Sequence, residues 1–437
     1  MGPTGARLDV AHRIRRLHPL LPAIRAELAR MDHASRPQVV AYQERRLRAM
    51  VRWAAARSPF YRELFRQNGI DPRDIRTLND LTAIPPIDRH HLVERGEEFR
   101  TFPAATMWSA SSSGTSGRPV GVYRTPGSSA YELCAQARQW SWFGLNASSR
   151  RIVLRGSDFA ADQPGRPVRD MSANAQLMVS SFHLDDEHLP QIMSAIEAFD
   201  PVAIEGWPSS MTVLAGLMQR HGITLPLRGI ITSSEVMSGP SRALMRAVFG
   251  GPIIDHYGQT ERVTMSGNCE RGTDHVFEDY GITELIPVEG HPDRWEIVGT
   301  PLHNWGFPLL RYRTGDEVGP APSPTCPCGR GFRTIGPIAG RAEDVFTAAD
   351  GRPLPLPSTV VDDLVGVLGA QIVQLARGQF EVRVVPGPDY DRAAVAAHIH
   401  RNTDRMFGLG QQLAIVELDA LVAGGSGKVK TAYVIGT

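Results

Sequence analysis

The chain has 437 residues, of which 42% are hydrophobic and 21% are charged, as in an ordinary globular protein. This length exceeds what one compact core usually supports, so we expect two domains or one large lobed domain. The 47 Lys and Arg residues nearly balance the 46 Asp and Glu residues, which gives a formal net charge of +1. This balance argues against nucleic acid or a membrane as a partner and favours small molecules.

The first 50 residues contain many arginines and no hydrophobic stretch of the signal-peptide kind, and the longest apolar runs elsewhere are short. We therefore expect a cytoplasmic protein. Four cysteines are too few for a disulfide framework in a chain of this length. Reduced thiols or a metal site fit them better.

Residues 37–65 have apolar side chains at helical spacing, including Leu47, Val51 and Ala54, and predict one amphipathic helix. Residues 69–86 are rich in Asp, Asn and Pro, which predicts short turns and helical pieces. From about residue 130 to 260, short apolar runs alternate with helical patterns. The expected strands are 151–154, 202–205, 229–232 and 252–256, and the expected helices include 210–221 and 241–249. This alternation predicts βαβ units and a mainly parallel sheet, which binds ligands at the carboxyl ends of its strands.

Residues 282–319 contain strand-like runs broken by Pro and Gly, which predicts an antiparallel sheet or small barrel. Further on, Phe380, Val382 and Val384 alternate with charged residues as in a half-buried strand, and 393–407 predict a helix. We therefore expect an α/β fold with two domains. Residues 1–340 form a large domain with a parallel sheet and an antiparallel element, and residues 341–437 form a small mobile α+β domain.

The segment 109–119 reads SASSSGTSGRP. Its small residues let the backbone approach an anion, its hydroxyls can donate to phosphate oxygens, and Arg118 adds positive charge. It does not match the Walker pattern G-x-x-x-x-G-K-[ST], which excludes a P-loop NTPase at this point. Taken alone, the segment fits a flexible Ser/Gly linker equally well.

Three further segments follow in order: YGQTE at 257–261, YRTGD at 312–316 and GRAED at 340–344. Together with the Ser/Gly segment they resemble the adenylate-forming superfamily, which includes acyl-CoA synthetases, luciferases and peptide-synthetase adenylation domains. Within it the chain is most similar to the phenylacetate-coenzyme A ligase family. The SPFYR stretch at 58–62 and the Leu-Asn-Asp-Leu and Ile-Pro-Pro sequences after it look like the amino-terminal region of that family. The resemblance covers most of the chain.

The resemblance implies that ATP and Mg²⁺ bind here. Residues 111–117 would bind the triphosphate, Thr260 would lie on the α-phosphate side, Glu261 would hold Mg²⁺, and Asp316 would accept hydrogen bonds from the ribose. On its own, Glu261 could be a solvated loop charge and Asp316 could close a turn. The implied ATP- and AMP-binding residues are Ser111, Ser112, Ser113, Gly114, Thr115, Ser116, Gly117, Ser234, Glu235, His256, Tyr257, Gly258, Gln259, Thr260, Asp316 and Arg341.

The sequence GGSGK, which ends at Lys428, resembles the mobile catalytic-lysine loop of the superfamily. An ammonium at this place would stabilise the negative charge that builds up when a carboxylate attacks the α-phosphate. Lys430 is the alternative lysine, and a basic tail without a role is the simpler interpretation. The family usually has Arg three residues after the lysine, whereas this chain has Thr431. The resemblance also places a hinge at Glu343 or Asp344.

Cys269, His275, Cys326 and Cys328 offer four ligands that suit a closed tetrahedral zinc site with a structural role. Their spacing lacks the usual C-x₂-C pairs, so unpaired thiols and a surface histidine fit about equally well. Similar Cys and His sets in some phenylacetate-ligase-like relatives favour zinc. Cys134 stands apart in a predicted helix.

Four residues could line a pocket for the acid at the carboxyl ends of the strands, although most aromatic side chains simply pack in cores. They are Trp140, Phe143, Trp207 and Pro208.

The resemblance implies that the chain joins a small, aromatic carboxylic acid to AMP and transfers the acyl group to coenzyme A. Other acceptors stay open, namely an amine, a carrier-protein thiol or an inorganic nitrogen nucleophile, as does a homodimer. A non-catalytic nucleotide-binding scaffold is the competing interpretation, but such a protein has no chemical need for Glu261, Asp316, Arg341 and Lys428 together. The sequence does not identify the acid.

Overall fold

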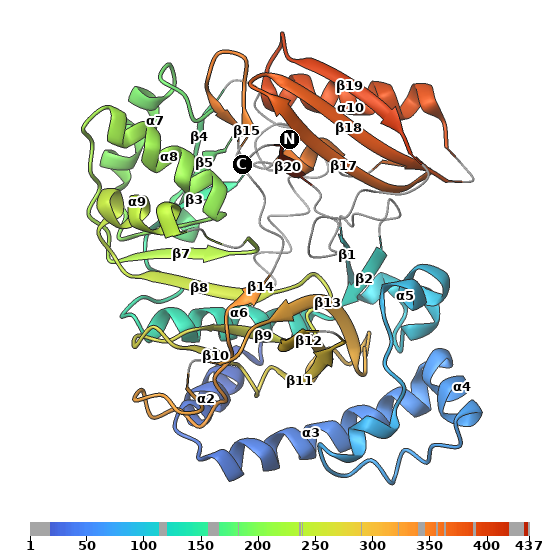
Figure 1. The fold of residues 1–437 in the computed structure, drawn as a ribbon. Coiled ribbons are helices and arrows are strands. Elements are labelled where there is room, and N and C mark those ends of the chain that lie inside the picture. Colours follow the sequence, from blue (N-terminus) through green and yellow to red (C-terminus); the bar gives the residue numbers. More distant parts are fainter. Residues whose placement is uncertain are drawn as a thin grey trace. The chain divides into compact units, whose positions relative to one another are not determined.

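The computed structural model describes residues 18–112, 120–155, 166–181, 183–235, 237, 239–289, 291–321, 323–339, 346–354, 357–361, 364–387, 390–418 and 432–435 (Figure 1). The described residues form two compact units. The first contains residues up to 112, residues 120–147 and residues 254–339, and the second contains residues 148–253 and those after 340. The predicted domain boundary at 340/341 stays a prediction.

The described helices of the first unit lie between residues 21 and 141. They are α2 (Leu21–Asp32), α3 (Arg36–Arg57), α4 (Pro59–Gln67), η1 (Asp80–Ala83), α5 (Arg89–Arg95), η2 (Gly96–Phe99), η3 (Ala104–Thr106) and α6 (Pro126–Ser141), which carries Cys134. The short pieces between residues 69 and 86 agree with the sequence analysis.

The expectation of one helix over 37–65 is wrong, because α3 ends and α4 begins at Ser58. The Ser58 backbone is extended, with ψ 123°, and its hydroxyl accepts a hydrogen bond from the backbone N–H of Tyr61. The ring of Pro59 disfavours helical geometry in the residue before it, whereas Pro is well suited to the first position of a new helix.

The strands of the first unit are antiparallel. β1 (Trp108–Ser112) pairs with β2 (Val120–Arg124), and β9 (Met265–Asn268) pairs with both β8 (Ile253–Gly258) and β10 (Asp274–Val276). A four-stranded sheet has the order β11 (Gly281–Val288), β12 (His291–Pro301), β13 (Tyr312–Val318) and β14 (Ile338–Ala339). The antiparallel element expected at 282–319 is thus present.

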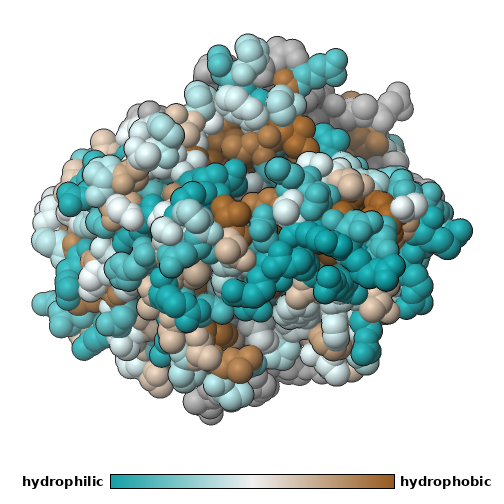
Figure 2. All heavy atoms as spheres, turned by 90° about the horizontal axis from the view of Figure 1, so that it is seen from below, coloured by the Kyte–Doolittle hydropathy of each residue, from teal (hydrophilic) through white to brown (hydrophobic). Residues whose placement is uncertain are grey.

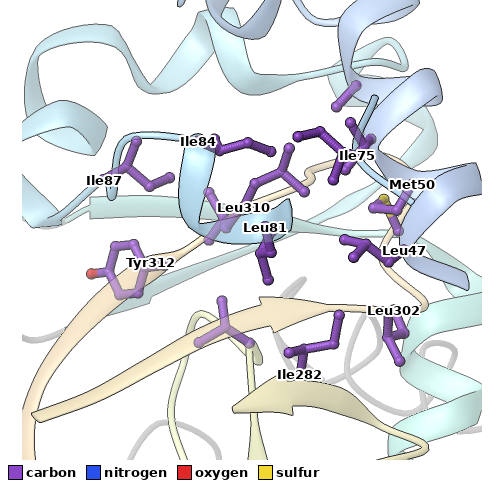
Figure 3. Packing of buried hydrophobic residues seen from close by; sticks show 14 of the residues in the cluster. Leu47, Met50, Ile75, Leu81, Ile84, Ile87, Ile282, Leu302, Leu310 and Tyr312 are labelled. Carbon is purple, nitrogen blue, oxygen red and sulfur yellow. The ribbon is translucent and has the colours of Figure 1, made fainter. Parts of the chain in front are cut away.

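One hydrophobic cluster joins the helices of this unit to its sheet. Figure 3 shows Leu47 and Met50 of α3 on the same cluster as Leu81, Leu310 and Tyr312. Each of these side chains is at most 3% exposed. Burial of such side chains contributes roughly 1.5–3 kcal/mol each, so the cluster fixes where β13 lies against the helices.

The second unit contains the parallel sheet. Its strands β3 (Arg151–Arg155), β5 (Gln176–Ser180), β6 (Ala203–Gly206) and β7 (Gly229–Ser233) are parallel, and β4 (Val168–Met171) is antiparallel to β5. Their order is β7-β6-β3-β5-β4. The 3₁₀ turn η4 (Ser172–Asn174) and helices α7 (Leu189–Phe199), α8 (Pro208–Arg220) and α9 (Gly239–Phe249) connect or follow these strands. The predicted α/β class is confirmed.

The carboxyl-terminal part of the second unit is a small α+β assembly. Its sheet has the order β19 (Gln412–Glu417), β18 (Gln379–Pro386), β17 (Val367–Ala376) and β20 (Ala432–Val434), accompanied by α10 (Arg392–Phe407). The short elements are β15 (Phe346–Thr347), β16 (Pro353–Leu354) and η5 (Pro357–Val361). Phe380, Val382 and Val384 are at most 1% exposed, so the predicted alternation along β18 is confirmed.

The face in Figure 2 is largely hydrophilic, with hydrophobic residues in small separate patches. Scattered apolar residues of this kind are normal on a protein surface. Among the described residues, no helix combines the length and apolar character needed to cross a bilayer.

Candidate active site

The YRTGD segment forms an irregularity in β13. Arg313 pairs with Val298 and Glu317 pairs with Glu296, so residues 314–316 lie opposite Ile297 alone. Thr314 Oγ1 donates a hydrogen bond to the Ile297 carbonyl at 2.8 Å and accepts one from the Asp316 backbone N–H at 3.1 Å. Gly315 has φ +74°, a conformation that glycine adopts without strain. Asp316 is the last residue of this bulge.

Two tyrosines connect this bulge to the YGQTE segment. The Tyr257 hydroxyl donates to Asp316 Oδ2 at 2.8 Å, and the Tyr312 hydroxyl donates to Glu261 Oε1 at 3.0 Å. Burial raises the pKa of Tyr257 well above its usual range, and the Asp316 carboxylate raises it further. The pKa of Tyr312 is raised by the same causes, burial first and then Glu261. Both hydroxyls therefore stay protonated donors at neutral pH.

The rest of the YGQTE segment lies at the end of β8. His256 and Gly258 belong to the strand, and Gln259 and Thr260 follow it. Arg124 Nη2 donates to the Thr260 carbonyl at 2.5 Å. The side-chain nitrogen and oxygen of Gln259 are buried without a hydrogen-bond partner among the described residues. Such orphaned polar atoms call for an explanation, and a polar ligand would supply one.

The remaining nucleotide-binding predictions fall elsewhere. Ser234 and Glu235 follow β7 in the second unit, at the carboxyl end of a parallel strand. Ser234 has φ +75°, which is strained for a residue with a side chain and is typical of functional loops. Ser111 and Ser112 end β1. The other predicted residues lie outside the described residues: Ser113, Gly114, Thr115, Ser116, Gly117, Arg341, Glu343, Asp344, Lys428 and the alternative Lys430.

The four pocket candidates divide between the units. Trp140, on α6, is only 3% exposed, and Phe143 follows the helix in a turn. Trp207 and Pro208 directly follow β6, at the carboxyl end of a parallel strand as expected, and Trp207 packs against the hydrophobic cluster of the carboxyl-terminal sheet. Their predicted contact with the acid stays a prediction.

Cys269, His275, Cys326 and Cys328 come together in the first unit. One candidate ligand atom from each lies within 4.8 Å of the others. Cys269 Sγ is 3.7 Å from Cys326 Sγ, and Cys328 Sγ is 3.4 Å from His275 Nε2. In a tetrahedral zinc centre with Zn–S of about 2.3 Å and Zn–N of about 2.1 Å, these separations would be about 3.8 and 3.6 Å. The donor set and its spacing fit a zinc ion.

The surrounding residues hold this cluster in shape. His275 Nδ1 lies 3.2 Å from the Phe332 carbonyl, an arrangement in which Nδ1 donates and Nε2 faces the thiols. Nearby, Glu278 is fully buried and accepts from the Arg333 side chain at 2.8 Å and its backbone N–H at 2.9 Å. Burial lowers the pKa of His275, which keeps the ring neutral as a metal ligand must be.

The sequence alone does not identify Glu278 as a site residue, and it indicates Tyr312 only as part of a motif. Each offers a weak signal, since Glu278 directly follows the apolar pair Val276 and Phe277, and Tyr312 begins the YRTGD segment. Their partners are far away along the chain, since Tyr312 is 51 residues from Glu261, and Glu278 is 55 residues from Arg333 and 242 from Arg36. No local pattern identifies these pairs.

The chain is similar in sequence and in fold to known proteins. No family model matches the chain. Over 343 residues it is 28% identical to a phenylacetate-coenzyme A ligase of Thermus thermophilus, covering 72% of this chain and 73% of that protein. Over 363 residues it is 27% identical to a phenylacetate-coenzyme A ligase of Aromatoleum evansii, covering 78% of each. A solved structure of 2-hydroxyisobutyryl-CoA ligase with 2-HIB-AMP and CoA is similar at a TM-score of 0.61 and 16% identity, covering 93% and 92%.

The chain has the fold of an adenylate-forming ligase. The sequence resemblance to phenylacetate-coenzyme A ligases is confirmed as well, and the comparisons bear out the predicted enzyme class. In this adenylate-forming ligase fold, the Tyr257, Glu261, Tyr312 and Asp316 group and the Cys and His cluster both belong to the first unit.

Proposed function

We propose that the protein activates a small aromatic carboxylic acid with ATP as acyl-AMP and pyrophosphate, and then transfers the acyl group to coenzyme A. One observation carries the proposal. Glu261 and Asp316, from segments 55 residues apart, each accept a hydrogen bond from a tyrosine of the other segment, in a chain that is 28% identical to a phenylacetate-coenzyme A ligase. The buried Glu261 carboxylate suits a metal–phosphate group, and the Asp316 carboxylate in the β13 bulge suits the hydroxyls of a ribose.

The residues have separate roles in this proposal. Residues 111–117 hold the triphosphate, Ser234 and Glu235 lie against the adenine, and Thr260 contacts the α-phosphate side. Glu261 holds Mg²⁺, and the Asp316 carboxylate accepts from the ribose hydroxyls. Magnesium neutralises phosphate charge, and it prefers few carboxylate ligands together with phosphate oxygens, which a single buried Glu261 fits.

Lys428 is the catalytic lysine of the proposal. The carboxylate oxygen attacks the α-phosphorus, the bond to pyrophosphate breaks, and the ammonium stabilises charge on the pentacoordinate centre. Arg341 lies near the ribose or phosphates. Residues 341–437 move as a small domain about Glu343 or Asp344, so that the thiol can enter after adenylation. The protein works in the cytoplasm.

Pyrophosphate release tests this function. The purified protein is incubated with ATP, Mg²⁺ and a panel of aromatic and aliphatic acids, with and without coenzyme A. We expect pyrophosphate with aromatic acids and a thioester only when coenzyme A is present. Acyl-AMP formation without any thioester would move the acceptor to an amine, a carrier-protein thiol or an inorganic nitrogen nucleophile. No pyrophosphate with any acid would reject the enzyme and favour a nucleotide-binding scaffold.

We further propose that Cys269, His275, Cys326 and Cys328 hold one structural zinc ion. Three thiolates and an imidazole leave no open coordination position, so the ion supports the fold and takes no part in the reaction. Elemental analysis should find about one zinc per chain, and chelation should lower the melting temperature. Metal-free protein whose melting temperature a chelator does not change would reject the site. Cys134 lies on α6 and is not one of the four cluster residues, so Cys134→Ser should keep the zinc, whereas Cys269→Ser should lose it.

A further inference from the structure

The hydrogen bonds between the two motif segments are crossed. Tyr257 begins the YGQTE segment but donates to Asp316 of the YRTGD segment, and Tyr312 begins the YRTGD segment but donates to Glu261 of the YGQTE segment. Each carboxylate therefore depends for its orientation on a tyrosine from the other segment. The two bonds span 59 and 51 residues of the chain.

The surroundings hold both tyrosines firmly. Tyr312 is 3% exposed and lies in the hydrophobic cluster of Figure 3, where its hydroxyl points away from Leu81 and Leu310. Its backbone is fixed by Ile87, which donates to the Arg311 carbonyl at 3.1 Å and accepts from the Arg313 N–H at 2.7 Å.

The ring of Tyr257 is packed differently, against the buried Val276, Ile297, Val318 and Ile335. Rings fixed in this way place their hydroxyls with little rotational freedom, so that each can hold a carboxylate in one orientation.

We propose that Tyr312 and Tyr257 are positioning residues that act across the segments, Tyr312 orienting Glu261 toward the metal–phosphate group and Tyr257 orienting Asp316 toward the ribose. The inference rests on the proposed nucleotide-binding function. It assigns Tyr257 a role through Asp316 in addition to any contact of its own. Its consequence is that a change in one segment alters the ligand held by the other.

Two single-atom changes test the crossed arrangement, Tyr312→Phe and Tyr257→Phe. Binding of a non-hydrolysable ATP analogue is measured against Mg²⁺ concentration, and metal-free binding of AMP and 2′-deoxy-AMP is measured by calorimetry. A hydrogen bond to a charged group is worth about a tenfold change in affinity or more. Tyr312→Phe should raise the Mg²⁺ concentration for half-maximal binding about tenfold and leave the preference for AMP over 2′-deoxy-AMP unchanged. Tyr257→Phe should reduce that preference about tenfold and leave the Mg²⁺ dependence unchanged.

The control variants distinguish the positioning role of the tyrosines from the proposed nucleotide binding itself. Tyr390→Phe removes a comparable hydroxyl that donates to Glu417 at 2.9 Å on the surface, and it should change neither measurement. Glu261→Gln should reproduce the Mg²⁺ effect, and adding Tyr312→Phe to it should have no further effect. Asp316→Asn should reproduce the loss of ribose preference.

Three outcomes would count against the inference. It is overturned if the carboxylate variants show these effects and the tyrosine variants do not, or if each tyrosine affects the ligand of its own segment. If neither Glu261→Gln nor Asp316→Asn changes nucleotide binding, the proposed nucleotide site fails and the inference fails with it. Tyr312 is buried, so Tyr312→Phe can also lower the melting temperature. Tyr257 is only half-buried, so Tyr257→Phe is expected to keep the fold and tests the arrangement independently.

Discussion

Replacement of Glu278 by alanine should destabilise the first unit and loosen the Cys and His cluster. The carboxylate is fully buried, contacts Arg36 Nη1, and accepts from the Arg333 side chain and backbone N–H. Through Arg333, it fastens the chain that follows Cys326 and Cys328 to the chain that follows His275. Its loss therefore affects both the free energy of unfolding and metal retention.

The magnitude follows from what the substitution leaves behind. Arg36 and Arg333 have side chains that are 41% and 43% exposed, so water can hydrate both cations once the carboxylate is gone. The cost therefore stays at or below the 3–5 kcal/mol typical of a broken buried ion pair. The Arg333 N–H loses its acceptor, which costs about 1–3 kcal/mol. Together these effects predict a loss of about 2–4 kcal/mol, and Glu278→Gln, which keeps an acceptor, should lose less.

Equilibrium urea unfolding followed by tryptophan fluorescence measures the loss, and elemental analysis after dialysis against a chelator measures metal retention. Glu63→Ala removes a carboxylate that pairs with Arg66 on the exposed face of α4 and should change little. An unfolding free energy of Glu278→Ala within about 1 kcal/mol of the wild type would refute the reasoning, because it would mean that Arg333 finds another acceptor.

Two further predictions concern the reaction. Lys428→Ala should lower the rate of acyl-AMP formation by on the order of 10² or more and largely keep the ATP affinity, because the ammonium acts on transition-state charge. Normal adenylation in this variant, together with loss of adenylation in Lys430→Ala, would assign the role to Lys430. Glu343→Pro or Asp344→Pro should restrict a hinge dihedral and stop one half-reaction while the other survives. Wild-type rates of adenylation and thioester formation in both proline variants would argue against domain rotation.

The sequence predicted the alternating strands and helices of the second unit well, because hydrophobic periodicity there is a local property. The strand expected at 229–232 is β7 (Gly229–Ser233), and the helix expected at 241–249 is α9 (Gly239–Phe249). The break at Ser58 was overlooked because the apolar spacing continues across it. A serine followed by a proline is nonetheless a start signal for a new helix.

Contacts that depend on tertiary structure were harder to predict. The Cys and His cluster lacks C-x₂-C spacing, yet the β9–β10 hairpin, with Gly272 at φ +78°, brings Cys269 and His275 together. A β-bridge between His275 and Thr334 then places the segment that carries Cys326 and Cys328 beside the hairpin. The residue types were visible in the sequence, but the pairing was not. The crossed tyrosines could not be found for the same reason.

The bulge in β13 also determines which changes in length this strand can accept. Beyond residues 314–316 the pairing is displaced by two residues, from Arg313 opposite Val298 to Glu317 opposite Glu296. Because side chains alternate with a period of two, this displacement leaves every later residue on the face it would otherwise occupy. Deletion of one residue here would leave two residues opposite Ile297, as in the commonest kind of β-bulge, and would keep the pairing of Glu317 and Val318 with β12. Deletion of two residues would restore a regular ladder and keep the sheet, but it would remove the bulge that carries Asp316.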